Sequence, residues 1–352
     1  MTRAIVVDGV RIADDTDCYV IAEIGNNHGG SVETCMAMFK AAHQCGASSV
    51  KLQKRHNRTL FTKALYDSTY DNENSFGPTY GAHREVLEFD RSQYQELKAY
   101  AAEIGITFFS TAFDMASADF LAELDMPAYK LASGDLTNTP LLKHVAKIGK
   151  PMFVSTGGGM MDDVRRAVDT ILPINEQLCV MQCTAGYPPP WEELNVRVIE
   201  TYRNEFPEVV IGFSSHDSGI AMALVGYMLG ARAVEKHFTL NRASLGTDHA
   251  FSLEPPGLRR LCRDLKRARI SLGDGVKRRY DSEIRPMLKM AKKLVAATDL
   301  PKGTILNLEH IAIRSPNDGT PPHMLESFIG RRLTRSLKVD ENLILEDTVG
   351  ER

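Results

Sequence analysis

The sequence lacks any apolar run that approaches the ~20 residues of a membrane-spanning helix, so we expect no membrane partner. Its N-terminus has no long apolar core followed by a small-residue cleavage site, which argues against secretion. An excess of charge of one sign is also missing, because the formal net charge is −3 over 352 residues. That balance gives no reason to expect nucleic acid as a partner. We therefore expect a cytoplasmic protein.

Cysteine is sparse, and the six copies are scattered without the paired spacing of zinc-binding motifs. Reduced thiols in a cytoplasmic protein are the simplest interpretation. An apolar content of 43% and a charged content of 25% are typical of a globular protein. Because 352 residues exceed the usual size of a single hydrophobic core, we expect two domains.

Short apolar runs alternate with helix-like stretches from residue 17 to about 272. The runs that we interpret as strands are Tyr19–Ile24, Ser49–Gln53, Thr107–Ser110, Ala128–Leu131, Met152–Ser155, Leu178–Gln182, Val209–Phe213 and Ala231–Val234. Strands that are each followed by a helix, eight times in succession, favour a closed (β/α)8 TIM barrel over an open sheet. The chemistry of such a barrel belongs at the C-terminal ends of its strands.

The pattern changes after the last barrel helix. We place the barrel domain at residues 1–272 and a linker rich in glycine and charge at residues 273–289. Short-strand patterns with turn residues then predict a small β-rich domain over residues 290–352. A domain of only ~60 residues is marginal on its own, so we expect it to rest against another part of the protein.

Two histidines, His216 and His237, each follow one of the last two predicted strands. Imidazoles at the ends of successive parallel strands would point into one mouth, where they could bind a metal ion. The alternative is two unrelated polar residues near strand ends.

Hydrogen-bond donors suited to phosphate also follow the predicted strands, together with a glycine-rich loop at residues 157–159. These donors are Lys51, Lys130, Ser133, Ser155 and Ser214. Three carboxylates, Glu23, Asp135 and Asp248, are candidate acid–base groups. The alternative for the two lysines is that they pair with these carboxylates and hold the barrel mouth together.

Seven motifs occur in order along the barrel. They are Ala22-Glu-Ile-Gly-Asn-Asn-His-Gly-Gly, Lys51-Leu-Gln, Ser110-Thr-Ala-Phe-Asp, Tyr129-Lys-Leu-Ala-Ser-Gly-Asp, Val154-Ser-Thr-Gly-Gly, Gln182-Cys-Thr-Ala-Gly-Tyr-Pro and Glu235-Lys-His-Phe-Thr. Together they make the chain resemble the sialic acid synthase family, which condenses phosphoenolpyruvate with an N-acetylated sugar. The tail is similar to the antifreeze-like (SAF) domain of that family, especially at Val295-Ala-Ala-Thr-Asp-Leu-Pro-Lys-Gly-Thr and Phe328-Ile-Gly-Arg.

The resemblance implies a role for each matching position. The residues implied to bind phosphoenolpyruvate are Lys51, Thr111, Lys130, Ser133, Ser155 and Ser214. Those implied to bind a divalent metal, usually Mn²⁺, are His216 and His237. Those implied to bind the sugar are Gln53, Tyr187 and Arg314, and the implied catalytic carboxylates are Glu23, Asp135 and Asp248. In the family the arginine that matches Arg314 reaches the barrel of the partner, which implies a domain-swapped homodimer.

The sequence departs from the family pattern at three positions. Asp135 stands where the family usually has glutamate, which shortens the reach of the carboxylate by one methylene. Ala185 stands where asparagine or serine is frequent, and it cannot donate a side-chain hydrogen bond to phosphate. Ala112 replaces a common proline, which affects backbone shape more than chemistry. The metal pair and the lysines are unaffected.

The longest insertion between barrel elements runs from Lys54 to Asp90, after the second strand. We expect it to close over substrate, with Tyr80 and Arg84 discriminating the substituents of the sugar. The alternative is a packed surface excursion without ligand contact.

The resemblance predicts condensation of phosphoenolpyruvate with an N-acetylated aldohexose, either N-acetylmannosamine or a diacetamido-trideoxyhexose, to a nine-carbon 2-keto-3-deoxy acid. Arg314 and the SAF-like tail favour an unphosphorylated N-acetyl sugar as acceptor. One alternative is a phosphoenolpyruvate-dependent aldolase that acts on a shorter sugar phosphate. The other is a carbohydrate-binding barrel that has lost catalysis.

Overall fold

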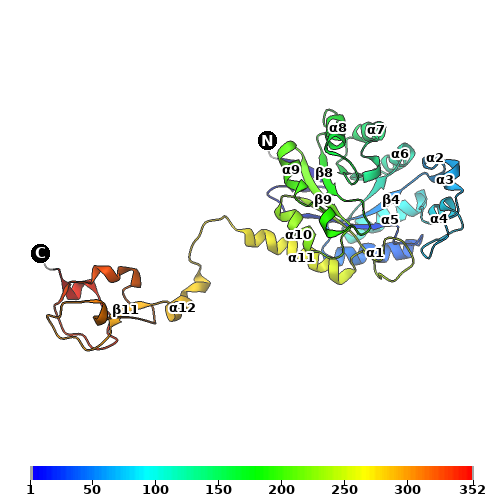
Figure 1. Cartoon of the computed structure of the whole chain (residues 1–352). Coiled ribbons are helices and arrows are strands. Elements are labelled where there is room, and N and C mark those ends of the chain that lie inside the picture. The colour runs from blue at the N-terminus through cyan, green and yellow to red at the C-terminus, as the bar shows by residue number, and fades with distance from the viewer. Residues whose placement is uncertain (1–2, 351–352) are drawn as a thin grey trace. The chain divides into compact units, whose positions relative to one another are not determined.

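The computed structural model describes residues 3–350, and its larger unit, Met1–Gly273, contains a closed barrel of parallel strands (Figure 1). Around the barrel the strands pair in the order β10-β3-β4-β5-β6-β7-β8-β9. Their bounds are β3 Tyr19–Gly25, β4 Ser49–Lys54, β5 Thr107–Ala112, β6 Tyr129–Leu131, β7 Met152–Ser155, β8 Leu178–Cys183, β9 Val210–Ser215 and β10 Ala233–His237. The predicted TIM barrel is confirmed.

Helices follow the strands and cover the outside of the barrel (Figure 1). They are α1 Val32–Cys45, α5 Arg91–Ile104, α6 Met115–Glu123, α7 Thr139–Ala146, α8 Met161–Ile171, α9 Val198–Glu205, α10 Ala221–Met228 and α11 Pro255–Leu272. Local sequence fixes their ends, as in α5, where Asp90 and Gln93 form a reciprocal capping box. The same helix ends at Gly105, whose φ of 76° is left-handed and suits glycine. No helix in the described part of the chain is long and apolar enough to cross a membrane.

The interior of the barrel has an apolar floor beneath polar side chains, because alternate residues of a strand point to the same face. Ile21, Phe109 and Phe153 belong to the buried apolar cluster inside the barrel. Two residues further along the same strands stand Glu23, Thr111 and Ser155, which are also buried. The period of two therefore places the polar groups in one layer at the C-terminal ends of the strands.

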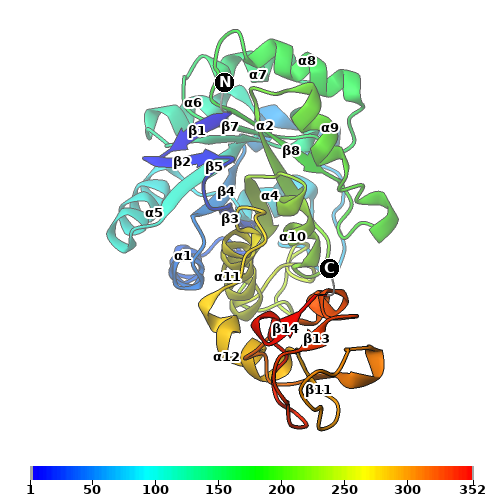
Figure 2. The ribbon, with the colours of Figure 1, turned by 90° about the vertical axis from the view of Figure 1, so that its left-hand side faces the viewer.

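An N-terminal hairpin, β1 (Ala4–Val7) and β2 (Val10–Ala13), belongs to the same apolar floor. Ile5, Val7 and Ile12 are 2%, 0% and 0% exposed and join the apolar cluster of the barrel interior. Figure 2 shows the two strands lying across the barrel strands. The hairpin thus shields from water the end of the barrel that lies opposite the polar layer.

The insertion after β4 contains three short helices, α2 (Asn57–Leu60), α3 (Lys63–Tyr66) and α4 (Tyr80–Val86). Aromatic rings hold it together, since the Tyr80 ring lies edge-on to Phe61 and to Tyr70, with centroids 5.0 and 5.4 Å away. This segment is therefore packed structure rather than an open loop.

The smaller unit, Asp274–Arg352, has its own hydrophobic core. Its strands are β11 (Lys293–Ala296), β12 (Ile311–Arg314), β13 (Arg332–Leu333) and β14 (Thr348–Val349), which pair as two antiparallel ladders. The core side chains are Leu294, Ala296, Leu300, Leu306, Phe328, Leu333, Leu337 and Leu343. Part of the segment predicted as a linker forms helix α12 (Asp281–Met290), which contains Pro286 and has no buried residue.

Candidate active site

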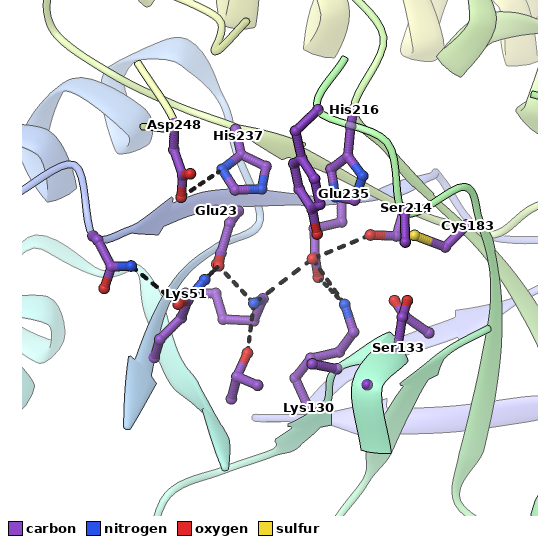
Figure 3. Close-up of a pocket in the computed structure, with 18 of the residues that line it drawn as sticks. Glu23, Lys51, Lys130, Ser133, Cys183, Ser214, His216, Glu235, His237 and Asp248 are labelled. Atoms are coloured by element: carbon purple, nitrogen blue, oxygen red, sulfur yellow. Dashed lines mark hydrogen bonds and ion pairs between the residues drawn. The ribbon is translucent and has the colours of Figure 1, made fainter. Parts of the chain in front are cut away.

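A cavity of about 500 Å³ opens at the C-terminal ends of the barrel strands (Figure 3). It brings together twelve of the fourteen predicted site residues: Glu23, Lys51, Gln53, Thr111, Lys130, Ser133, Ser155, Tyr187, Ser214, His216, His237 and Asp248. The lining also includes Asn26, Arg55, Arg84, Phe113, Ala132, Gly134, Cys183, Ala185, Glu235 and Thr247. Residues from all eight strand ends therefore face one volume.

The floor of the cavity is a network of buried charges that centres on Glu235. Lys130 Nζ lies 2.8 and 2.7 Å from the two carboxylate oxygens of Glu235. Lys51 Nζ lies 3.6 Å from Glu235 Oε1, 2.7 Å from Glu23 Oε2 and 2.7 Å from Thr111 Oγ1. Lys51 therefore pairs with Glu23, as the alternative prediction for the lysines expected, whereas Lys130 pairs with Glu235, which that prediction did not include. Both lysines also line the cavity.

Sequence reasoning missed Glu235, although a signal for it was present. Glu235 stands two residues before His237, and β10 runs through both because its pairing with β3 continues to the pair His237 and Glu23. The strand predicted from the sequence ends at Val234, where the apolar run stops. The period of two would have placed Glu235 on the face of His237.

Burial acts against the charge on Glu235, but the ammoniums of Lys130 and Lys51 outweigh it and hold the pKa of this carboxyl below its usual range. The pKa of Lys130 is lowered, chiefly by burial, while Glu235 acts in the opposite direction. Both pairs are shielded from water, since Lys51 and Lys130 are each 2% exposed. A dianionic ligand could therefore compete with the carboxylates for two strongly attracting cations.

Serine hydroxyls complete one side of the cavity, and a neighbouring glycine loop holds one of them. Ser155 Oγ is buried and has no hydrogen-bond partner within residues 3–350. The backbone N–H of Gly157 donates to Ser133 Oγ at 2.9 Å, and a Cβ at position 157 would stand 2.8 Å from that oxygen. Glycine is thus needed for the close approach of this loop. The unpaired Ser155 hydroxyl is a free donor for an oxyanion.

The carboxylate of Glu23 is held from two directions. Gln53 Nε2 donates to Glu23 Oε1 at 2.8 Å, and Lys51 pairs with the other oxygen. Gln53 Oε1 in turn accepts from Arg55 at 2.6 Å. This chain of contacts fixes the orientation of Glu23 between the lysines and the cavity mouth (Figure 3).

The two histidines lie side by side above the lysines, with ring centroids 5.3 Å apart (Figure 3). His216 Nδ1 lies 3.0 Å from the carbonyl oxygen of Thr184, which suits an N–H at Nδ1 and leaves Nε2 as an acceptor. Burial and the neighbouring His237 lower the pKa of His216 to about 3, so this ring is neutral at physiological pH. Tyr187 stacks on His216 at 4.1 Å and shields one face of it.

These features fit a divalent metal ion. A metal-binding imidazole is neutral and commonly donates its second nitrogen to a carbonyl, as His216 does. His237 Nδ1 is buried without a hydrogen-bond partner in the described chain, and Asp248 Oδ2 lies 3.7 Å from it. Within residues 3–350 no group of three or more histidine, cysteine or acidic side chains is arranged to bind a metal. The two imidazoles would therefore be the protein donors to such an ion, and imidazole donors suit manganese, cobalt, zinc or iron.

Two predicted site residues do not line this cavity. Asp135 stands in a single 3-10 turn, where its Oδ1 accepts from Asn138 Nδ2 at 3.0 Å, and burial raises its pKa. Arg314 belongs to the smaller unit and pairs there with Asp340 Oδ1 at 2.5 Å. The roles of both in catalysis or sugar binding stay predictions.

Comparisons with known proteins identify the family of the chain. Residues 38–277 match the NeuB family, and residues 293–343 match the SAF domain. The chain is 36% identical over 330 residues to the N-acetylneuraminate-9-phosphate synthase of Homo sapiens, covering 94% of this chain and 92% of that one. It is 31% identical over 337 residues to the N,N'-diacetyllegionaminic acid synthase of Legionella pneumophila, covering 94% of each chain.

A solved structure is also similar. The N-acetylneuraminic acid synthetase of Leptospira borgpetersenii, in complex with citrate, has a TM-score of 0.71 and 27% sequence identity, covering 82% of this chain and 96% of that one. The chain therefore belongs to the NeuB family. It is an enzyme of the sialic acid synthase type with a C-terminal SAF domain, so the resemblance of the motifs is confirmed.

Proposed function

We propose that the protein condenses phosphoenolpyruvate with an N-acetylated aldohexose to give a nine-carbon 2-keto-3-deoxy acid and inorganic phosphate. The observation that carries this proposal is the convergence of two buried ammoniums, Lys51 and Lys130, and two imidazoles, His216 and His237, on one cavity. The names of the relatives, which are synthases of nine-carbon sugar acids, support the product class.

The reaction balances without an outside oxidant or reductant. Carbon 3 of phosphoenolpyruvate bonds to the aldehyde carbon of the open-chain sugar, and the aldehyde oxygen takes up a proton. Water adds at carbon 2 and loses one proton, and the hydroxyl left on carbon 2 gives its remaining proton to the departing phosphate as the bond from carbon 2 to the bridging oxygen breaks. Inorganic phosphate leaves, and carbon 2 becomes the ketone of the product.

The donors on the cavity floor have the chemistry to hold the enol phosphate. Lys51 and Lys130 attract the phosphate, while the hydroxyls of Ser155 and Ser133 offer neutral donors beside it. These groups are fixed before substrate binds, so they stabilise charge without reorganising. Ala185 lines the cavity without a side-chain donor, so the neighbouring groups supply the contacts.

Proton movement is assigned to the carboxylates. Glu23 is the first candidate to move protons between water and the sugar oxygen, because Gln53 and Lys51 hold it in place at the cavity. Asp248, which lies beside His237, is the second. A divalent ion, for which Mn²⁺ is our first choice, would be held by His216 and His237 and would supply a Lewis acid for the aldehyde oxygen.

The test is phosphate release from phosphoenolpyruvate with Mn²⁺ and a small panel of N-acetyl sugars, with the product identified by mass. A nine-carbon keto acid supports the proposal, whereas a seven- or eight-carbon acid supports the shorter-sugar aldolase. His216→Ala and His237→Ala should each abolish turnover and metal dependence together, while His43→Ala on the exposed side of α1 should not. Normal activity of a chelated His237→Ala protein would contradict the scheme.

The proposal extends to the assembly and to the form of the acceptor. Arg314 would bind the N-acetyl group in the barrel of a partner copy, which makes the enzyme a domain-swapped homodimer, and we expect it in the cytoplasm. A 9-phosphate in a product arises from carbon 6 of the acceptor, because phosphoenolpyruvate supplies the first three carbons. The names of the relatives include both phosphorylated and unphosphorylated products, so they leave the form of the acceptor open.

A further inference from the structure

We infer that Arg55 and Arg84 form a phosphate-binding site at the cavity mouth, and that the acceptor is an N-acetylhexosamine 6-phosphate. This inference rests on the proposed function and differs from the unphosphorylated acceptor that the sequence led us to expect. Both arginines line the same cavity as Lys51 and Lys130.

Arg55 lies above the phosphoenolpyruvate end of the site. It directly follows β4, and it stands four residues after Lys51 and two after Gln53. At the rise of an extended chain, four residues correspond to roughly 13 Å. The hydrogen bond from Arg55 to Gln53 Oε1 shows that the two side chains meet on the same side of the strand. Arg55 therefore belongs to a part of the cavity that the floor lysines do not reach.

The Arg55 guanidinium is buried and only partly satisfied. The residue is 8% exposed, and its guanidinium carbon stacks on Phe113 at 3.8 Å from the ring centroid. Its NH1 is buried with no hydrogen-bond partner in the described chain. Glu88 Oε1 lies 3.9 Å from NH1, while Glu88 Oε2 is bound by Lys54 Nζ at 3.1 Å. The charge of Glu88 is thus shared with a second cation.

Arg84 adds a second guanidinium at the same mouth. Its Nε donates to the hydroxyl of Tyr80 at 3.1 Å, and its guanidinium carbon lies 5.1 Å from the centre of the Tyr80 ring. Across residues 3–350, no carboxylate forms an ion pair with Arg84. Tyr80 itself does not line the cavity, so it holds Arg84 rather than contacting the ligand.

Two neighbouring guanidiniums that have only the distant, shared carboxylate of Glu88 as an ion-pair partner within residues 3–350 favour an anionic ligand. Burial, and then the charge of Arg84, lower the pKa of Arg55 to about 10, which shows that the protein alone does not stabilise this cation fully. A phosphate monoester carries close to two negative charges and accepts paired N–H bonds from guanidinium groups. A sugar hydroxyl or N-acetyl group would leave this charge unbalanced.

The direction of the acceptor gives the position of its phosphate. The aldehyde must meet carbon 3 of phosphoenolpyruvate near the lysines and histidines on the cavity floor. The rest of the sugar chain then extends toward the mouth, so carbon 6 comes to Arg55 and Arg84. The two phosphates therefore occupy separate cation pairs, and the phosphate ester at carbon 6 is not broken in the reaction.

The experiment compares kcat/KM for N-acetylmannosamine and N-acetylmannosamine 6-phosphate in the full-length protein, with phosphoenolpyruvate and Mn²⁺. We expect the phosphate ester to be favoured by about 10- to 100-fold, the effect of one or two charge-assisted hydrogen bonds. In Arg84→Gln and in Arg55→Gln this preference should fall to near one. Arg84 is the safer position to change, because it is only half-buried and has no buried ion pair to lose.

Arg58→Gln is the matched control. Arg58 belongs to the same insertion and stacks on Tyr66, with 71% of its side chain exposed, but it does not line the cavity. Its replacement should keep the preference for the phosphate ester. Equal use of the two acceptors by the wild-type protein would overturn the inference, as would a preference that survives in Arg84→Gln and in folded Arg55→Gln.

Binding of each acceptor, measured by calorimetry, separates this inference from the proposed function. If neither acceptor is turned over but the 6-phosphate still binds in an Arg84-dependent way, the condensation reaction is wrong and the phosphate site stands. If turnover occurs without any binding preference for the 6-phosphate, the reaction stands and the site is wrong.

Discussion

Glu235 is the carboxylate that both floor lysines share, at 2.7 Å from Lys130 and 3.6 Å from Lys51. Ser214 Oγ also donates to it at 3.3 Å. Glu235 therefore keeps two cations close together at the bottom of the cavity. In the proposed reaction the same two cations meet the phosphate, so this carboxylate sets how much charge the ligand must supply.

Replacing Glu235 by glutamine should destabilise the ligand-free protein. The change leaves the Lys130 ammonium buried without its partner, and breaking a buried pair in this way costs about 3–5 kcal/mol. Phosphoenolpyruvate should restore part of the lost stability, because its phosphate replaces the missing charge. Thermal unfolding with and without phosphoenolpyruvate measures both effects. Glu103→Gln, at an exposed position of α5, is the control. An unchanged melting temperature of Glu235→Gln would contradict the claim that Glu235 stabilises the buried Lys130 ammonium.

His28 should make the free energy of unfolding decrease as the pH is lowered. It stacks on Phe89 with centroids 4.2 Å apart, accepts from the backbone N–H of Gly30 at 3.1 Å, and burial lowers its pKa to about 3. Between that value and the ordinary pKa near 6.5 the unfolded chain binds the extra proton, so the free energy of unfolding falls as pH falls. One such histidine contributes up to about 1.4 kcal/mol per pH unit.

Urea unfolding between pH 6 and pH 4 measures this dependence. The free energy of unfolding should change less steeply with pH in His28→Gln than in the wild-type protein. The glutamine side chain can still accept the hydrogen bond from the Gly30 N–H. His43, which is exposed on α1, does not share this environment, and His43→Gln should keep the wild-type slope. Equal slopes in all three proteins would show that His28 is not held neutral by burial.

At the scale of the element, the strands could be predicted because short apolar runs that alternate with helix-like stretches fit few other folds in a chain of this length. The residues at which strands end were harder to predict. β10 extends past its apolar run to His237 because pairing with β3 continues through polar residues. For that reason the sequence did not predict Glu235 as a site residue. It did not predict Arg55 either, because the packing of Arg55 against Phe113 and the insertion is what brings its guanidinium to the cavity. The segment predicted as a linker contains most of helix α12, whose apolar residues Ile284, Met287 and Leu288 recur at helical spacing although none of them is buried.

The N-terminal hairpin should stabilise the barrel without taking part in the chemistry. Ile12→Ala removes a side chain that is 0% exposed beneath the barrel interior, and a substitution of this kind costs about 2–5 kcal/mol. Val6→Ala on the same hairpin is the control, because Val6 is 46% exposed. Chemical denaturation of the two variants gives the difference. A loss in Ile12→Ala no larger than that in Val6→Ala would mean that the hairpin is dispensable for the barrel.

At the scale of the whole molecule, the chain joins a barrel that contains the cavity to a SAF domain that has its own core. The match to the SAF domain begins at residue 293, directly at the start of β11. Arg314 stands in β12 of that domain, 49% of its side chain is exposed, and it pairs only with a half-exposed aspartate among the described residues. Its guanidinium is therefore accessible to a ligand once that pair opens.

Mixed dimers test whether Arg314 acts on the barrel of a partner copy. Lys51→Ala removes a floor cation from one barrel, and Arg314→Ala removes the arginine of one SAF domain, so each variant alone should have little activity. In a hybrid of the two, exchange of domains gives one site with both residues intact and one site with neither. Equal co-expression should then recover about a quarter of the wild-type activity, because half of the dimers are hybrids with one working site. If Arg314 served its own barrel instead, each hybrid site would lack one residue, and no activity would return.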